Sequence, residues 1–247
     1  MSAERLRIAF VHIPRTAGTT FGVALDALYA DRRIAKFYGD DDGGVANRRI
    51  DAFRALDPRD KNDVDLLRGH FVYGFDTGLN GVRHVTLLRD PLRRLISFYF
   101  YALKDRGNYL HAYLKQRRMG LEQFLTSDVC LDLDNYQVRA ISGAQFASVR
   151  EPVAQQHCDD AKWHLEREFV AFGLTEQFDR SIGLFNHTFG WNLPAIEQRN
   201  VGGYAADLTL SDECLQLVRE KNRFDIELYQ FAAGLFESRA SGLQPAQ

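Results

Sequence analysis

Four short runs rich in β-branched and aromatic residues, each separated from the next by helical patterns, constrain the fold most. They cover residues 6–13, 64–73, 82–88 and 169–174. Runs of this length and composition predict buried strands, and apolar residues at helical spacing follow them, as at Phe21, Leu25 and Leu28. Such alternation predicts an α/β fold, here a single domain with a central, mostly parallel sheet flanked by helices.

The length of 247 residues fits one large domain. We expect this domain to span residues 1–237 and residues 238–247 to form a flexible tail. The hydrophobic share of 45% and the charged share of 26% are typical of globular proteins, which excludes disorder as the dominant state. Residues 39–47 are rich in Asp and Gly and predict a solvated loop.

Charge and cysteine content limit the partners and the compartment. The 31 basic and 33 acidic residues leave a net charge of −2, so we expect no general binding to nucleic acid, and any anion site must be local. Three cysteines far apart cannot form a disulfide framework, which favours a reducing compartment. With no apolar stretch near the ~20 residues of a membrane span and no signal-peptide pattern, we expect a cytoplasmic protein without an anchor.

The segment His-Ile-Pro-Arg-Thr-Ala-Gly-Thr-Thr at residues 12–20 joins the first strand to the first helix. Gly18 lets the backbone approach a ligand, Arg15 adds a positive charge, and the helix offers unpaired N–H groups at its start. Hydroxyl groups come from Thr16, Thr19 and Thr20. These features predict an anion site, although a threonine-capped turn explains them as well. The spacing differs from the Walker pattern for nucleoside triphosphates.

A second motif, Arg-Asp-Pro-Leu-Arg-Arg-Leu-Ile-Ser-Phe-Tyr, follows the third strand at residues 89–99. Asp90 fits the N-cap and Pro91 the first position of a helix. Arg89 at the strand end and Ser97 two helical turns later are predicted to meet and hold a second phosphate. The alternative is that Arg89 pairs with Asp90 and that Ser97 bonds back to its own helix.

Two anion sites after two strands of one sheet suit a ligand with two anionic ends. Residues 12–20 resemble the 5′-phosphosulfate loop of the sulfotransferases, and Arg-Asp-Pro-x-x-Arg-x-x-Ser-x-Tyr resembles their 3′-phosphate motif. The likeness runs from about Ile8 to Phe236 and is greatest to the group of heparan sulfate and uronyl 2-O-sulfotransferases and their bacterial relatives. It implies the P-loop-like sulfotransferase fold and 3′-phosphoadenosine 5′-phosphosulfate as the donor. We expect no metal, because none of the residues singled out requires one.

The resemblance also assigns roles within the two motifs. The 5′ end of the donor would be held by Thr16, Ala17, Gly18, Thr19 and Thr20. Arg89 and Ser97 would hold the 3′-phosphate. Arg15 departs from the family, which usually has Lys here; its planar guanidinium would neutralise the leaving phosphate with a different geometry.

His70 ends the second strand region in the segment Arg-Gly-His-Phe. An imidazole with a pKa near ~6.5 can accept a proton at neutral pH, but an isolated histidine is more often structural. Relatives in the 2-O group have Arg/His-Gly-His here, and the resemblance therefore implies that His70 is the catalytic base. His12 is expected to pack behind the first loop.

Three weaker signals complete the candidate site. Asn135 and Arg139 lie four residues apart in Asp-Asn-Tyr-Gln-Val-Arg, so they share a helical face and line an acceptor cleft or form a polar clamp between helices. Arg199 begins an Arg-Asn-Val-Gly-Gly segment that resembles the family's loop over the nucleotide. The basic segment 104–118 would suit an anionic or sugar acceptor, but a charge run is more often a solvated face, and we keep that as the default.

These observations together predict an enzyme that transfers a sulfuryl group from 3′-phosphoadenosine 5′-phosphosulfate to an acceptor hydroxyl, on a sugar or another carbohydrate-containing molecule. His70 would take the acceptor proton. One alternative is a phosphotransferase that uses a nucleoside triphosphate. The other is a nucleotide-binding or glycan-binding module without catalysis.

Overall fold

The computed structural model describes residues 6–39, 47–75, 79–144, 151–194 and 209–242. Its sheet consists of β1 (Arg7–Val11), β2 (Ile34–Phe37), β3 (Leu66–Gly69), β4 (Val82–Leu88) and β5 (Phe169–Leu174). The strand order is β2-β3-β1-β4-β5, and every pairing is parallel. The predicted α/β fold with a parallel central sheet is confirmed.

Helices connect the strands and extend the chain beyond the sheet. The first part of the chain contains α1 (Gly18–Leu28), α2 (Asn47–Arg54), α3 (Pro58–Asn62), α4 (Pro91–Lys104), α5 (His111–Arg117) and α6 (Leu121–Thr126). The second part contains α7 (Tyr136–Ile141), α8 (Gln155–Arg167), α9 (Phe178–Phe189), α10 (Asp212–Lys221) and α11 (Arg223–Ala240). Two short 3-10 turns are η1 (Leu131–Leu133) and η2 (Thr175–Gln177). No described helix combines the length and the apolar character needed to cross a membrane.

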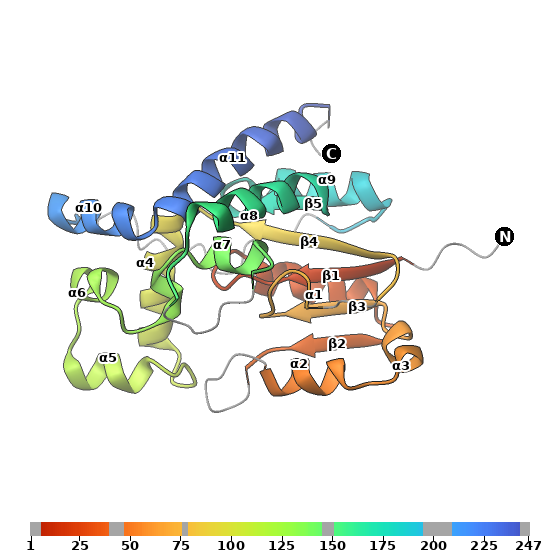
Figure 1. Cartoon of the computed structure of the whole chain (residues 1–247), viewed down its shortest axis with the longest axis horizontal. Coiled ribbons are helices and arrows are strands. Elements are labelled where there is room, and N and C mark those ends of the chain that lie inside the picture. Colours follow the sequence, from red (N-terminus) through yellow and green to blue (C-terminus); the bar gives the residue numbers. More distant parts are fainter. Residues whose placement is uncertain (1–5, 40–46, 76–78, 145–150, 195–208, 243–247) are drawn as a thin grey trace.

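Both faces of the sheet are covered (Figure 1). Ile8 and Phe10 of β1 pack with α1 and α9, whereas Ala9 and Val11 of the same strand pack with α2, α7, α8 and α11 on the opposite face. This follows from the alternation of side chains along a strand, and it explains why β1 is apolar throughout. A third core joins α4, α5, α6 and α10, which lie beyond the carboxyl ends of the strands, at the left of Figure 1.

The transition from β4 to α4 follows the local sequence closely. Asp90 is the N-cap, its side chain accepts a hydrogen bond from the Arg93 N–H at 2.9 Å, and Pro91 takes the first helical position. Both predictions are confirmed. Because only two residues separate the strand from the helix, Arg89 is held at the edge of the sheet where the strands end.

Two features differ from the sequence prediction. Strand β2 was not predicted, because its four residues, Ile-Ala-Lys-Phe, lie at the sheet edge and only Phe37 is buried. The closing part of the chain forms two helices, α10 and α11, which are divided at Asn222; its amide donates to the Leu133 carbonyl at 3.0 Å and accepts from the Asn135 N–H at 3.1 Å. Helix α11 continues to Ala240, three residues into the segment expected to be a tail.

Candidate active site

The carboxyl edge of the sheet gathers the residues singled out from the sequence. The loop of residues 12–17 follows β1, Tyr38 follows β2, His70 follows β3 and Arg89 follows β4. These four strands are neighbours and all parallel, so the segments that follow them lie side by side. Ligands of open α/β sheets bind at this edge.

The loop after β1 has a special backbone. Arg15 and Ala17 have φ angles of 70° and 63°, a left-handed conformation that is uncommon for residues other than glycine. The buried Thr16 hydroxyl donates to the Ile13 carbonyl at 2.8 Å, so it shapes the turn instead of facing a ligand. Strain of this kind is found where the surrounding structure holds a functional loop in place.

Helix α1 begins without a cap. Its N-cap residue, Ala17, makes no side-chain hydrogen bond to the helix, and the first turn has no acidic residue. The Phe21 N–H bonds the Ala17 carbonyl at 3.2 Å, which leaves the earlier N–H groups of Gly18, Thr19 and Thr20 outside the helical pattern. Together with the positive end of the helix dipole, these N–H groups are suited to the predicted role of binding an anion.

Gly18 is required by the position of His12. A Cβ atom at residue 18 would lie 2.1 Å from Cδ2 of His12, because the imidazole packs directly against the start of α1. His12 therefore lies behind the loop, as predicted. Burial, together with the nearby His70, Arg68 and Arg15, lowers the pKa of His12 well below its usual value, so the ring is neutral.

Arg15 joins the two sequence motifs. Its Nε and Nη2 both donate to Ser97 Oγ at 3.1 Å, and its guanidinium carbon lies 4.4 Å from the centre of the Tyr101 ring. Ser97 and Tyr101 are one turn apart on α4. The predicted contact between Arg89 and Ser97 is wrong: Arg15 takes that hydroxyl because β1 and β4 are neighbours, while the Arg89 guanidinium turns toward the Arg15 carbonyl.

The side chain of Arg89 is largely buried at the base of this loop. Its Nη1 donates to the Arg15 carbonyl at 3.0 Å, and its Nε lies 4.0 Å from Glu176 Oε1. Within the described part of the chain, this buried Nε has no hydrogen-bond partner. Burial lowers the pKa of Arg89. A buried cation with an unused donor is suited to bind an anion.

Gln137 on α7 holds the backbone of Arg89, and sequence reasoning missed it. Its Oε1 accepts from the Arg89 N–H at 3.0 Å and its Nε2 donates to the Arg89 carbonyl at 2.9 Å. The carboxylate of Asp225, from α11, accepts from the backbone N–H groups of Gln137 and Val138 at 3.1 and 2.8 Å and so anchors the start of α7. The only signal in the sequence was the Asp-Asn-Tyr-Gln-Val-Arg segment itself.

His70 lies at the same edge, half-buried. Its ring centre is 4.9 Å from that of His12 and 5.0 Å from that of Tyr38. Its N–H donates to the Phe37 carbonyl at 2.7 Å, and a Cβ at Gly69 would lie 2.0 Å from that carbonyl oxygen, so only glycine can precede His70 here. Burial lowers the pKa of His70 to about 4, which leaves the imidazole neutral and able to accept a proton.

Tyr38 links this histidine pair to a buried ion pair, and it was also missed because β2 was not predicted. Arg68 donates to the Tyr38 hydroxyl at 2.6 Å and, through a two-pronged contact at 2.7 and 2.5 Å, to the carboxylate of Asp26. Since arginine can only donate, the tyrosine uses its own hydrogen toward Nδ1 of His12, at 3.0 Å. This places the proton of neutral His12 on Nε2.

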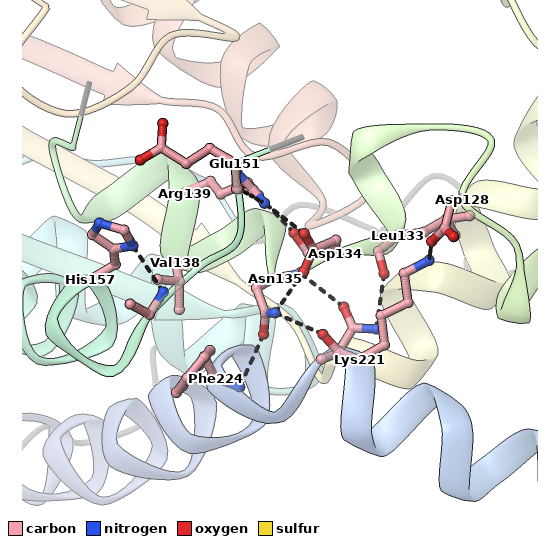
Figure 2. Close-up of polar contacts among 12 residues, drawn as sticks. Asp128, Leu133, Asp134, Asn135, Val138, Arg139, Glu151, His157, Lys221 and Phe224 are labelled. Atoms are coloured by element: carbon pink, nitrogen blue, oxygen red, sulfur yellow. Dashed lines mark hydrogen bonds and ion pairs between the residues drawn. The ribbon is translucent and has the colours of Figure 1, made fainter. Parts of the chain in front are cut away.

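Asn135 and Arg139 form a clamp between helices (Figure 2). Asn135 Oδ1 accepts from the backbone N–H groups of Phe224 and Asp225 at 3.0 Å each, and its Nδ2 donates to the Lys221 carbonyl at 2.7 Å. Arg139 Nη2 donates to the Asp134 carboxylate and the Glu151 carbonyl. Their exposed fractions are 4% and 3%, so the structure favours the polar clamp over the acceptor cleft.

Two other histidines, both on α8, make structural contacts. Arg199 lies outside the described residues. Nδ1 of His157 accepts from the Ala154 N–H at 3.0 Å at the start of α8, and Nδ1 of His164 lies 3.0 Å from the Ile141 carbonyl. Among the residues that the structure describes, no cluster of three or more His, Cys, Asp or Glu side chains is arranged to hold a metal ion.

An open parallel sheet with an uncapped helix start and partly buried arginines at its carboxyl edge is the arrangement that proteins binding ligands with anionic groups commonly use. The sequence model of the sulfotransferase family matches residues 1–232, and the chain belongs to that family. This confirms the family expected from the two motifs.

Two known proteins illustrate the relationship. Heparan-sulfate 6-O-sulfotransferase 2 of Danio rerio is 37% identical over 285 aligned positions, which cover 94% of this chain and 58% of the relative. The chain thus spans less than two thirds of that relative's length. The crystal structure of mouse sulfotransferase SULT7A1 complexed with PAP matches with a TM-score of 0.42 and 11% identity, over 91% of this chain and 66% of that one. The likeness to the 2-O group stays a prediction.

Proposed function

We propose that this chain is an enzyme that transfers a sulfuryl group from 3′-phosphoadenosine 5′-phosphosulfate to a hydroxyl of a carbohydrate acceptor. The observation that carries the proposal is the contact between Arg15 and Ser97, which brings the two anion-binding motifs together at one edge of the sheet. Membership of the sulfotransferase family and the name of the zebrafish relative support the donor and the class of acceptor.

The residues present fit such a donor at both of its ends. The N–H groups of Gly18, Thr19 and Thr20 suit the 5′ end, and within the described part of the chain the hydroxyls of the two threonines make no hydrogen bond. Arg89, with its buried and unpartnered Nε, suits the 3′-phosphate. The two sites are linked, because Arg89 Nη1 bonds the carbonyl of Arg15.

The chemistry assigned to the chain is positioning, charge stabilisation and proton removal. Sulfuryl transfer places negative charge on the leaving phosphate, and Arg15 with the N–H groups at the start of α1 stabilises that charge. His70 accepts the proton of the acceptor hydroxyl. The pKa of about 4 belongs to the protein without ligands. Anionic groups bound beside the ring favour its protonated form, so they raise this pKa and make His70 a stronger base.

Donor binding and transfer separate the proposal from its two alternatives. We expect 3′-phosphoadenosine 5′-phosphate to raise the unfolding temperature, ATP with Mg²⁺ to leave it unchanged, and label from ³⁵S-donor to enter a carbohydrate in a panel of acceptors. Stabilisation by ATP with Mg²⁺ alone would favour a phosphotransferase. Nucleotide binding without label in any acceptor would favour a binding module.

The role of His70 is tested with His70→Ala. General base catalysis typically contributes roughly 10²–10⁴-fold, so kcat should fall by that factor while the affinity for 3′-phosphoadenosine 5′-phosphate stays within about twofold. His187→Ala, at an exposed position on α9, serves as the matched control and should retain full activity. A loss of less than about tenfold in His70→Ala would reject the assignment.

The 3′ site is tested with Arg89→Ala. Its affinity for 3′-phosphoadenosine 5′-phosphate should fall much more than its affinity for adenosine 5′-phosphate, since only the first ligand carries the 3′-phosphate. Arg167→Ala removes an equal charge from an exposed position on α8 and should affect neither ligand. Equal weakening of both nucleotides by Arg89→Ala would contradict the proposed site.

A further inference from the structure

The ring of Tyr101 lies against the guanidinium of Arg15. The guanidinium carbon is 4.4 Å from the ring centre, within the range of an attractive cation–π contact. Ser97, one turn earlier on α4, accepts from Nε and Nη2 of the same guanidinium at 3.1 Å. Arg15 is thus held along one edge by a hydroxyl and on one face by a ring.

We propose that Tyr101 is a positioning residue that sets the plane of the Arg15 guanidinium in the active site. The inference rests on the proposed function, in which Arg15 stabilises the leaving phosphate. It adds a specific claim, namely that the catalytic orientation of Arg15 depends on an aromatic face supplied by α4.

The two contacts together fix the orientation of an arginine in a way that they would not for a lysine. A guanidinium is planar, so it can donate from its edge to Ser97 and stack its face on Tyr101 at the same time. An ammonium group can also donate to a hydroxyl and lie over a ring, but it has no plane, so these contacts do not fix an orientation for it. Tyr101 therefore has a specific use beside Arg15. It fixes the plane of the guanidinium, and a lysine ammonium has no such plane to fix.

Tyr101 is itself held in place without being part of a core. The residue is 37% exposed, and it belongs to none of the three buried clusters of the described residues. Burial and a hydrogen bond to the Asp105 carboxylate raise the pKa of Tyr101 to about 12. Asp105, at the end of α4, also accepts from the Gly107 N–H at 3.0 Å. The hydroxyl of Tyr101 thus contacts Asp105, while the face of its ring lies against Arg15.

The orientation of Arg15 also depends on its backbone. Its φ of 70° directs the chain into a conformation that few side chains favour, and the Arg89 guanidinium bonds its carbonyl. The loop therefore fixes where the Arg15 side chain starts, while Ser97 and Tyr101 fix where it ends. Loss of the ring should release the guanidinium without disturbing the folded core.

The test is a double-mutant cycle on sulfuryl transfer with Tyr101→Leu, Arg15→Lys and the double variant. Tyr101→Leu should lower kcat by roughly threefold to thirtyfold, the range expected for a cation–π contact, with a smaller change in the donor KM. In the Arg15→Lys background the same substitution should change kcat by less than twofold. An equal effect in both backgrounds, or a rise in kcat, would overturn the inference.

Two variants control for a general structural effect. Tyr101→Phe keeps the ring face and should retain kcat within about twofold, whereas a loss equal to that of the leucine variant would contradict the inference. Tyr113→Leu removes the ring of a similar pair on α5, where Arg117 lies 4.7 Å from the ring centre. It should leave kcat and the donor KM unchanged, and a loss like that of Tyr101→Leu would also count against the inference.

A readout without catalysis separates this inference from the proposed function. The readout is the NMR chemical shift of the Arg15 Nε–H, which is assigned by its absence in Arg15→Lys. An aromatic ring stacked on the guanidinium changes this chemical shift through its ring current. It should move in Tyr101→Leu and change little in Tyr101→Phe. If wild-type protein transfers no label but this resonance behaves as expected, the proposed function fails and the stacking stands. If the resonance does not move, the stacking fails by itself.

Discussion

Replacement of Gln137 tests whether its buried hydrogen bonds to the Arg89 backbone, at the end of β4, support the 3′-phosphate site. The Gln137 side chain is fully buried, and both of its polar atoms bond the backbone of Arg89, at 3.0 and 2.9 Å. Leucine has nearly the same volume and no polar atoms. Gln137→Leu therefore removes both hydrogen bonds and leaves the N–H and the carbonyl of Arg89 without these partners.

The expected loss of stability follows from the number of backbone polar groups left without a hydrogen-bond partner. A buried polar group without a partner costs about 1–3 kcal/mol, so two such groups should lower the free energy of unfolding by about 2–6 kcal/mol. A typical domain has about 5–15 kcal/mol in total, so the variant should fold but unfold at lower urea concentration. Release of Arg89 also weakens a charge-assisted hydrogen bond worth about 1.5–3 kcal/mol, which is roughly tenfold to a hundredfold in Kd.

Urea unfolding and calorimetry measure the two effects separately. Calorimetry of the folded variant should show weaker binding of 3′-phosphoadenosine 5′-phosphate and little change for adenosine 5′-phosphate. Gln123→Leu, at an exposed position on α6, is the matched control and should change stability by less than about 0.5 kcal/mol. A comparably small change in Gln137→Leu, or equal weakening of both nucleotides, would refute the reasoning.

Three further predictions concern the loop, the base and the clamp. Gly18→Ala places a Cβ 2.1 Å from the His12 ring and should cost about 1–3 kcal/mol and lower nucleotide affinity, whereas Gly183→Ala, with open space at its Cβ, should be tolerated in thermal unfolding. Because the pKa of His70 is lowered from 6.5 to about 4, its contribution to stability is complete above pH 6.5 and is lost as the pH falls toward 4. His70→Gln should therefore reduce the slope of the unfolding free energy against pH between these values. An unchanged slope would contradict the lowered pKa. Asn135→Ala should lower stability by about 2–4 kcal/mol with the acceptor KM within twofold, and a changed KM at full stability would favour acceptor binding instead.

The sequence predicted the elements whose signals are local. Short β-branched runs marked four of the five strands, and Asp90 with Pro91 marked the start of α4, because periodicity and capping depend on residues close together in the chain. The placement of His70 and Arg89 at strand ends followed from the same runs. Edge strand β2 lacked such a signal, because an exposed four-residue strand has no buried face to require apolar residues.

Only the tertiary structure decided which of these side chains meet. The order β2-β3-β1-β4-β5 brings Arg15 to Ser97 and Tyr38 to His12, and the packing of α7 brings Gln137 to Arg89. Each pair joins segments far apart in the chain. Residue pattern specifies that strands form and which face is buried, but strand order and register arise from the packing of the whole sheet. For that reason the residue types of the site could be predicted from the sequence, whereas their partners could not.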